Sequence, residues 1–498
     1  MIKNPSPEQK KIFQWFKSGC GNLVVRARAG TGKTTTILEG VELASEPRIL
    51  LAAFNKSIAV ELQSRIKSER VQAKTLHGLG YAFVRRMWGA VSLDTDGQRA
   101  LDLARAVCEP KTSHRVLQLL AKIHSKVREI QPHESKSDDI MELMTKFDLL
   151  PDDDMEFDDG VTDRWLANRA SKAVALAKKR SPMIDFADMI FLPVVHRAVQ
   201  PWFDLVVVDE AQDMTSAQLE LAIGSCKKGG RIAIVGDDRQ AIYGFRGADS
   251  GSLDRLKKIL RAKELGLTTT YRCPKRVVEI ASQYVDDFRA APSAPEGIVE
   301  SCSDDRMVSL VAPKDFILSR TNAPLVKVCM ALLQSGRRAY VKGRDIGKGI
   351  MTLVDRQGAR DLEELEKFLR SWHARESEKA MKILDDKVAQ ERLDFVSDQL
   401  GVCLTIAEDV DTMEGFRAKL ENLFRDDGGD AVVCSTVHRA KGLESANVFL
   451  LEGTFRGLDD TEKRGEEQNI VYVAVTRSKQ RLWWVSGFET KSVKREVS

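Results

Sequence analysis

This chain of 498 residues lacks the features that mark several common classes of protein. Its eight cysteines are scattered and form no C-x-x-C pair, which argues against a zinc or iron–sulfur site and fits a reducing compartment. No apolar run is long enough to cross a membrane, and the opening residues, Met-Ile-Lys-Asn-Pro, do not resemble a signal peptide. We therefore expect a cytoplasmic protein with no membrane partner.

Neither sign of charge is in large excess, because 77 Lys and Arg stand against 73 Asp and Glu. A nucleic-acid partner therefore cannot be inferred from bulk charge and would need local basic surfaces. Hydrophobic residues make up 43% of the chain and charged residues 30%, as in soluble globular proteins. The length predicts several domains.

The segment 25–36 reads V-R-A-R-A-G-T-G-K-T-T-T and connects an apolar run to a helix-competent stretch. Backbone N–H groups of such a loop can point at phosphate oxygens, and the helix N-terminus adds its positive dipole end. Lys33 would reach the β- and γ-phosphates, and Thr34 would hold Mg²⁺. Ala27 replaces the first glycine of the usual G-x-x-x-x-G-K-T pattern. The predicted phosphate contacts are Ala29, Gly30, Thr31, Gly32, Lys33, Thr34 and Thr35.

A second box lies at 203–212, where the apolar, β-branched run 203–208 is followed by Asp209, Glu210, Ala211 and Gln212. Such a run is typical of a buried parallel strand. At its carboxyl end Asp209 would contact Mg²⁺, and Glu210 would orient and deprotonate the attacking water. The alternative is a helix N-cap followed by a solvated acid. The two boxes together favour a nucleotide-hydrolysing site.

Strand and helix patterns alternate at both ends of the chain, which predicts parallel sheets covered on both faces. Between about 90 and 182 the pattern is helical with no strand run, and its acidic segment 152–159 is interpreted as a solvated loop. A second α/β pattern begins near Leu265, and another mostly helical stretch, about 345–427, interrupts it. We expect two α/β domains, each with a helical insert.

Three further motifs carry a family resemblance: V-G-D-D-R-Q-A-I-Y-G-F-R-G-A at 235–248, T-V-H-R-A-K-G-L-E at 436–444 and V-Y-V-A-V-T-R at 471–477. With these motifs the chain resembles a superfamily 1 helicase of the UvrD/Rep/PcrA type. A-F-N-K at 53–56 and K-T-L-H-G at 74–78 also resemble the F-box DNA helicase branch, although the sequence has no visible F-box.

The resemblance implies an α/β fold with two RecA-like parallel-sheet motor domains, each interrupted by a mostly helical insert. The first motor domain would comprise 1–90 and 183–262, with its insert at 91–182. The second would comprise 263–344 and 428–498, with a short insert at 345–427.

The same resemblance assigns the rest of an ATP pocket. Gln9 would read the adenine edge, although a polar residue early in an N-terminal helix has an ordinary alternative role. Tyr271 would stack on the adenine, and Glu444 would bond the ribose.

The resemblance also implies three sensors of the γ-phosphate. Arg272 would neutralise charge on the transferred phosphoryl group. Arg477 would add a second such cation from the other domain, which would make hydrolysis depend on closure of the cleft. Gln240 would sense the γ-phosphate or the attacking water.

Single-stranded nucleic acid binds where bases stack on aromatic rings and cations follow the phosphates. Phe245 stands where the family has a base-stacking tryptophan, and Tyr243 and Arg246 lie in the same segment. Core packing is an equal alternative for Tyr243. The other DNA contacts that the resemblance implies are Phe54, Asn55, Lys56, Thr75, His77, Thr436 and His438. A histidine outside such motifs would ordinarily be structural.

The expected function is an ATP-dependent helicase or translocase on single-stranded DNA and DNA junctions, with ATP and Mg²⁺ as cofactors. The resemblance implies 3′ to 5′ travel and a bacterial or phage-encoded protein of DNA repair, recombination or replication. One alternative is an ATPase that displaces proteins from single-stranded DNA, which the short second insert favours. Another is the motor subunit of a nuclease or defence complex. Possible partners are therefore a nuclease or a single-strand-binding protein. An RNA helicase fits the motifs less well.

Overall fold

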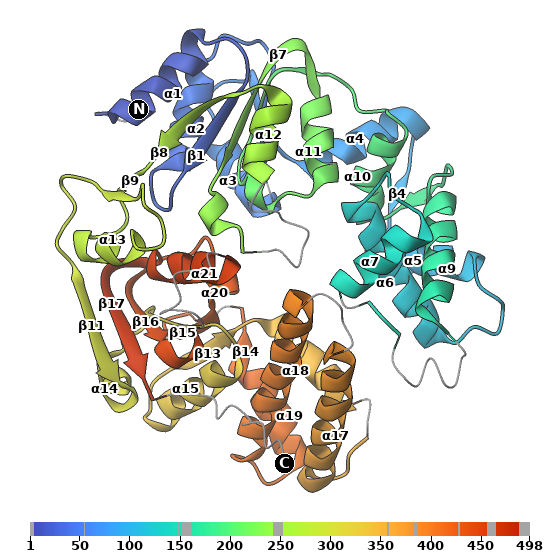
Figure 1. The fold of residues 1–498 in the computed structure, drawn as a ribbon, viewed down its shortest axis with the longest axis vertical. Coiled ribbons are helices and arrows are strands. Elements are labelled where there is room, and N and C mark those ends of the chain that lie inside the picture. The colour runs from blue at the N-terminus through green and yellow to red at the C-terminus, as the bar shows by residue number, and fades with distance from the viewer. Residues whose placement is uncertain are drawn as a thin grey trace. The chain divides into compact units, whose positions relative to one another are not determined.

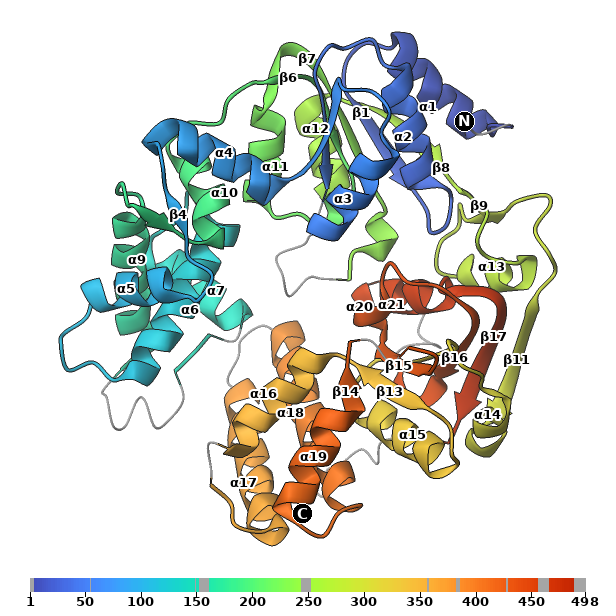
Figure 2. The ribbon, with the colours of Figure 1, turned by 180° about the vertical axis from the view of Figure 1, so that it is seen from behind.

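The computed structural model describes residues 4–53, 55–147, 149–151, 161–242, 252–355, 358–381, 386–426, 429–455 and 465–487 (Figures 1 and 2). The chain forms two compact units. The first comprises Met1–Ala27 and Gly32–Leu267, and the second comprises Arg28–Thr31 and Thr268–Ser498.

The first unit contains a six-stranded parallel sheet in the order β3-β2-β6-β7-β1-β8. Helices cover both faces, and the central strands have long apolar runs, as in β2 and most of β6. The bounds are β1 (Leu23–Ala27), α2 (Lys33–Leu43), β2 (Ile49–Ala53), α3 (Lys56–Arg65), β3 (Val71–Thr75), β6 (Phe203–Val208), α11 (Ser216–Gly224), β7 (Cys226–Gly236), α12 (Ser252–Leu260) and β8 (Lys263–Leu267), with α1 (Pro7–Ser18) preceding the sheet.

The strand β8 corrects the sequence analysis, which placed residues 263–267 at the start of the second domain. It pairs in parallel with β1 along its whole length, from Leu23↔Lys263 to Ala27↔Leu267. As a short edge strand that contains Gly266, β8 has too weak an apolar pattern to show which sheet it joins. The other predicted domain bounds stay predictions.

A helical region interrupts this unit between β3 and β6. It comprises α4 (Leu76–Trp88), α5 (Gln98–Ala106), α6 (His114–Ile130), α7 (Ser137–Lys146), α9 (Asp163–Ala177) and α10 (Phe186–Val195). Its own core includes Leu120, Ile123 and Leu166. Within this region the two-residue strands β4 (Ser92–Leu93) and β5 (Met183–Ile184) pair in parallel, a feature that the sequence analysis did not predict.

Helices α4 and α10 run parallel and in close contact. Their first turns meet where the His77 and Phe186 rings lie 5.9 Å apart, and their ends meet where the Trp88 and His196 rings lie 5.9 Å apart. Gly80 makes the approach possible, because a Cβ atom there would lie 1.9 Å from the Met189 carbonyl oxygen. The helices therefore form a tightly packed pair.

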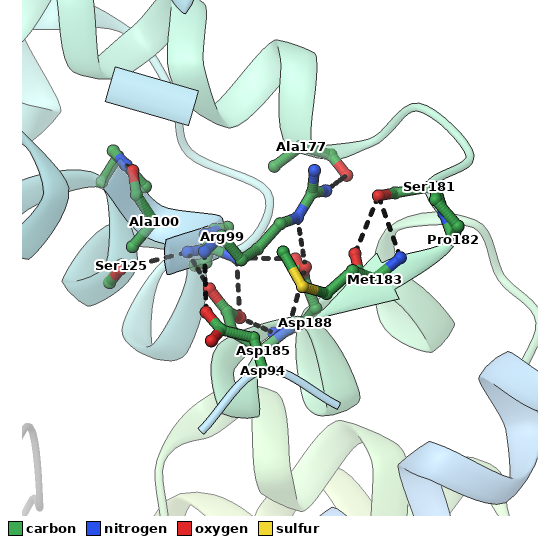
Figure 3. Close-up of polar contacts among 12 residues, drawn as sticks. Asp94, Arg99, Ala100, Ser125, Ala177, Ser181, Pro182, Met183, Asp185 and Asp188 are labelled. Carbon is green, nitrogen blue, oxygen red and sulfur yellow. Dashed lines mark hydrogen bonds and ion pairs between the residues drawn. The ribbon is translucent and has the colours of Figure 1, made fainter. Parts of the chain in front are cut away.

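A largely buried ionic network, with Arg128 and Asp188 at its centre, fixes the start of α10 (Figure 3). Arg128 of α6 contacts Asp188 Oδ1 at 2.6 Å and Asp185 Oδ2 at 2.8 Å, while Arg99 Nε lies 3.1 Å from Asp188 Oδ2. Asp185 and Asp188 also form the capping box of α10. The network therefore joins α5 and α6 to the start of α10.

The second unit contains a seven-stranded parallel sheet in the order β11-β17-β16-β12-β15-β13-β14. A short ladder of β9 (Thr269–Thr270) and β10 (Arg289–Ala290) precedes it. The strands are β11 (Ile298–Ser303), β12 (Phe316–Ser319), β13 (Ala339–Lys342), β14 (Phe424–Arg425), β15 (Val432–Thr436), β16 (Ser445–Leu451) and β17 (Ser478–Ser486).

Helices of this unit pack on the sheet and form a second helical group between β13 and β14. Those beside the sheet are α13 (Lys275–Ala281), α14 (Asp304–Leu310), α15 (Ala323–Gln334), α20 (Val437–Ala440) and α21 (Glu466–Val475). The group between β13 and β14 is α16 (Arg344–Asp355), α17 (Leu362–Met381), α18 (Asp386–Ala407) and α19 (Met413–Leu423). Within the described ranges no helix is long and apolar enough to cross a membrane.

Candidate functional site

The phosphate-type loop between β1 and α2 has the backbone shape that its sequence predicts. Gly30 and Gly32 have φ values of 67° and 74°, which side chains disfavour. Gly32 is the N-cap of α2 and provides no side-chain cap, so the first N–H groups of the helix remain suited to an anion. Thr34 and Thr35 follow in the first turn, both half-buried.

Lys33 lies against both predicted catalytic carboxylates. Its Nζ is 3.5 Å from Asp209 Oδ1 and still closer to Glu210 Oε1. Burial alone would lower the pKa of Lys33, but Glu210 and Asp209 raise it well above its usual value. Burial raises the pKa of Asp209 against the attraction of Lys33. The lysine is therefore firmly cationic and held by two acids that follow β6.

The backbone of Glu210 is strained, with φ 52° and ψ 40° in a residue other than glycine. Such conformations cost of order 1–3 kcal/mol and cluster at functional sites. Gln212 holds the side chain, because its Nε2 donates to Glu210 Oε2 at 2.6 Å.

The same amide connects Glu210 to the next motif. Gln212 Oε1 accepts from the Asp237 N–H at 3.1 Å, and Gln240 Nε2 donates to Asp237 Oδ2 at 2.7 Å. A Cβ atom at Gly236 would lie 2.5 Å from Gln212 Oε1, so a side chain there would displace the Gln212 amide. Sequence reasoning missed Gln212 and Asp237, although both lie inside the motifs that it singled out.

Gln9 is buried in α1, where its side chain has two partners. Its Nε2 donates to Thr36 Oγ1 at 3.0 Å, and its Oε1 accepts from the Ser6 N–H in a capping box. The amide thus lies beside the first turn of α2, while its predicted contact with adenine stays a prediction.

In the second unit, the phosphate-loop backbone of Arg28–Thr31 has two aromatic partners. The Ala29 N–H donates to Tyr472 Oη at 2.9 Å, and the Tyr271 N–H donates to the Gly30 carbonyl at 2.8 Å. The Tyr271 side chain is 54% exposed, as a ring that stacks on a base requires. Sequence reasoning missed Tyr472.

Three predicted ATP residues lie together in this unit. Arg272 Nε is 2.6 Å from Glu444 Oε2, and Lys479 also contacts Glu444, at 2.9 Å. Burial would raise the pKa of Glu444, but Lys479 and Arg272 hold it below its usual value. Arg477 is only 1% exposed, and burial together with Arg272 lowers its pKa to about 10. Glu444 here neutralises cations, so its predicted bond to ribose stays a prediction.

Two predicted DNA residues of the first unit cap helices. Asn55 Oδ1 accepts from the Ile58 N–H at the start of α3, and Thr75 Oγ1 accepts from the Gly78 N–H at the start of α4. Lys56 is exposed in the first turn of α3. Caps of this kind place a helix N-terminus, which itself suits a phosphate.

His77 follows in α4 and is half-buried, and burial lowers its pKa. The neighbouring Phe186 side chain is 54% exposed although it is a large apolar residue. No sequence pattern distinguishes Phe186 from the buried apolar residues that follow it.

The remaining DNA candidates divide between the second unit and undescribed positions. Thr436 is buried as the N-cap of α20, and His438 is half-buried within that helix. Phe54, Tyr243, Phe245 and Arg246 lie outside the described residues.

Comparison with known proteins decides the family. The model of the UvrD/REP helicase N-terminal domain matches residues 6–260, and that of the UvrD-like helicase C-terminal domain matches residues 431–485. This chain belongs to the UvrD/Rep helicase family. The predicted fold class is thereby confirmed, with parallel sheets consistent with two RecA-like motor domains.

Its relatives include eukaryotic and bacterial members. The chain is 27% identical to F-box DNA helicase protein 1 of Schizosaccharomyces pombe over 96% of this chain and 57% of the relative. It is 24% identical to ATP-dependent DNA helicase PcrA of Leuconostoc citreum over 94% of this chain and 80% of the relative. With DNA helicase II of Escherichia coli it shares 25% identity over 53% of this chain and only 38% of the relative. The chain thus spans about half the length of several relatives.

Proposed function

We propose that this UvrD/Rep family chain is an ATP-driven DNA motor that moves along single-stranded DNA in the 3′ to 5′ direction and unwinds duplex ahead of it. The observation that carries the proposal is the grouping of Lys33, Asp209 and Glu210 beside a glycine-dependent phosphate loop. ATP is the cofactor implied by the family, whose members include a relative named as an ATP-dependent DNA helicase.

The donor set fits a magnesium–nucleotide complex. Mg²⁺ is usually bound by one or two protein oxygens together with phosphate and water, and Thr34 with Asp209 supplies such a pair. Among the described residues, no group of three or more His, Cys, Asp or Glu side chains could hold a metal ion by itself. When bound, the ion would neutralise charge on the transferred phosphoryl group.

The residues of this chain then have separate tasks. Lys33 exchanges its two carboxylate partners for the β- and γ-phosphates. Glu210, freed from the lysine but still held by Gln212, orients the water and accepts its proton. Gln240, joined to this group through Asp237, reports the state of the γ-phosphate. Arg272 and Arg477 provide cations for the same phosphate, Tyr271 and Gln9 hold the adenine, and Glu444 holds the ribose.

The nucleic-acid contacts complete the proposal. DNA phosphates are contacted at the starts of three helices. The residues are Asn55 and Lys56 at α3, Thr75 and His77 at α4, and Thr436 and His438 at α20. To these we add Phe186, whose exposed ring lies against His77 and suits a base. Phe54, Tyr243, Phe245 and Arg246 stay in the proposed set on sequence grounds. DNA junctions, a nuclease and a single-strand-binding protein are the proposed partners.

Two other functions use the same motor. In one, the protein removes other proteins from single strands and hardly unwinds duplex, and the small group α16–α19 favours this reading. In the other, the chain is the motor of a nuclease complex and has little activity alone. The proposed domain bounds are those of the sequence analysis, with β8 moved into the first motor domain.

The test measures ATP turnover with single-stranded DNA, duplex DNA or RNA, for the parent and for Lys33→Ala. We expect strong stimulation by single-stranded DNA and near-complete loss of turnover in the variant with its melting temperature preserved. Strand displacement and removal of a protein block, measured on the same preparation, separate unwinding from protein displacement. Absence of stimulation by any DNA, or normal turnover in Lys33→Ala, would overturn the proposal.

A further inference from the structure

A basic surface lies at the far ends of α4 and α10, away from the candidate single-strand contacts. Three segments meet there. Arg180 Nη2 donates to the Trp88 carbonyl at 3.0 Å, and the His196 ring nitrogen lies 2.8 Å from the Lys178 carbonyl oxygen. The ring contact between Trp88 and His196 joins the end of α4 to the end of α10. The ends of α4, α9 and α10 therefore converge on one place, as Figure 2 lets the reader follow.

The charge of this surface has one sign. Six cations lie on it, and the three stretches 81–91, 175–184 and 189–202 contain no Asp or Glu. Five of the cations are exposed and the sixth is half-buried. None of them forms an ion pair with another described residue, in a chain whose charges are otherwise nearly balanced. We call these six residues the basic surface: Arg85, Arg86, Lys178, Lys179, Arg180 and Arg197.

Helix capping explains only part of this arrangement. A cation near one helix C-terminus is an ordinary complement to the helix dipole. Here three C-termini converge, and their cations repel one another unless an anion is nearby. Arg197, moreover, has φ 51° directly after α10, where glycine is the usual residue. An arginine at that position is unfavourable for the fold and adds charge to the surface.

We propose that the basic surface binds the phosphate backbone of duplex DNA next to the single strand that the motor holds. This inference rests on the proposed function. The geometry supports it because α4 and α10 begin at His77 and Phe186, the proposed single-strand contacts, and end at the basic surface. A helix of this length spans roughly 20 Å. One DNA molecule with a single-stranded tail can therefore reach both ends of the helix pair.

Exposed cations in a fixed array suit phosphates better than bases, so the contact is independent of sequence and strongly dependent on salt. Each phosphate contact contributes about 0.9 to the slope of log affinity against log salt concentration. Binding through this surface should thus be recognised by its salt slope and by its absence on short single strands.

The test variant combines Arg86→Gln, Lys179→Gln and Arg197→Gln, one change from each segment. All three side chains are exposed, and none belongs to the proposed ATP or single-strand site. The matched control combines Lys11→Gln, Lys17→Gln and Lys228→Gln, which removes the same charge from exposed positions of the same unit. The probes are a hairpin duplex with a 3′ tail and a short single strand of the tail sequence.

We expect the test variant to bind the tailed hairpin about tenfold or more weakly at 0.1 M salt, with a salt slope lower by about 2.7. Its affinity for the short single strand should equal that of the parent, and the control should keep the parent's slope. If the triple variant melts early, Arg86→Gln and Lys179→Gln alone should each lower the slope by about 0.9.

An unchanged salt slope in the test variant would overturn the inference. Loss of binding to a polyglutamate peptide with DNA binding unchanged would also overturn it, because the surface would then bind an acidic peptide in place of DNA. ATP turnover by the parent separates this failure from that of the proposed function. If the tailed hairpin stimulates ATP turnover by the parent and the salt slope of the test variant is unchanged, only the proposed duplex surface is ruled out. If no DNA stimulates ATP turnover by the parent, the proposed motor function is ruled out.

Discussion

Two groups in the first unit each hold one cation against two carboxylates, and they have opposite designs. In the group at the phosphate loop, Lys33 faces Asp209 and the strained, partly exposed Glu210. In the helical region, Arg128 faces Asp185 and Asp188 with no exposure of its side chain. This second group also includes Arg99, which contacts Asp188. The first group can change partners, whereas the second has no access to a ligand.

The difference comes from residue type and backbone. A lysine is a flexible point charge that moves readily from one anion to another, while the arginine fork fits two fixed carboxylates at once. Asp185 and Asp188 are further held by their capping box, whereas Glu210 has an unfavourable backbone conformation. A buried ionic group is thus no sign of function by itself. Exposure, strain and a replaceable cation distinguish the functional one.

The largest effect expected at the first group comes from Glu210→Gln. The amide keeps the shape of the side chain but cannot accept a proton, so ATP turnover should fall about 10²–10⁴-fold. ATP binding and melting temperature should stay close to those of the parent. Single-turnover kinetics and nucleotide titration measure both. Loss of ATP binding without slower chemistry would show that Glu210 only supports the fold.

At the second group, Arg128→Met should destabilise the fold by about 3–5 kcal/mol, because Asp185 would lose its cation and Asp188 would keep only Arg99. Denaturant unfolding gives the free energy. As a control, Asp185→Asn added to Arg128→Met should restore part of the loss by removing the carboxylate that is left without a cation. A loss under about 1 kcal/mol would place the network among ordinary surface ion pairs.

A smaller effect concerns pH and the buried His124, which faces Arg128, Arg99 and Asp185. Burial, with Arg128 second, lowers the pKa of His124 to about 3, whereas an unfolded histidine titrates near 6.5. The unfolded chain therefore binds the extra proton as pH falls below about 6.5, and stability declines by up to about 1.4 kcal/mol per pH unit. His124→Gln should reduce this slope in denaturant unfolding between pH 7 and 5. Equal slopes in both proteins would mean that folding does not lower the pKa of His124.

The smallest effect is expected at His77. Burial lowers the pKa of His77 below its usual value, so the neutral ring is the main form at pH 7 and above. Its contribution to single-strand affinity should therefore be nearly the same at pH 8 and pH 7, and His77→Asn should weaken binding about equally at both. A parent whose affinity rises from pH 8 to pH 7 while the variant's does not would show that His77 binds phosphate as a cation.

Those parts of the fold that bury continuous apolar runs could be predicted from the sequence. The strand Phe203–Val208 has the predicted bounds because both its faces are covered. The edge strand β8 and the two-residue strands β4 and β5 were missed or misplaced, since so few residues leave no periodicity. Arg128 is 57 residues from Asp185, and no local pattern connects them.

The candidate site divides in the same way. The meeting of Lys33 with Asp209 and Glu210 follows from motif order and from the common edge of a parallel sheet. The bridge from Gln212 to Asp237, and the place of Phe186 beside His77, depend on packing between strands and helices. These contacts required the folded chain, because no spacing in the sequence specifies them.

Gly80 has a mechanical consequence. With no room for even a methyl group between α4 and Met189, the two helices cannot slide past each other without a backbone collision. The pair therefore behaves as a single stiff rod. If DNA binds at both ends of the pair as proposed, a force applied at one end would reach the other through this contact. A larger residue at position 80 should push α4 and α10 apart and loosen the contact between them.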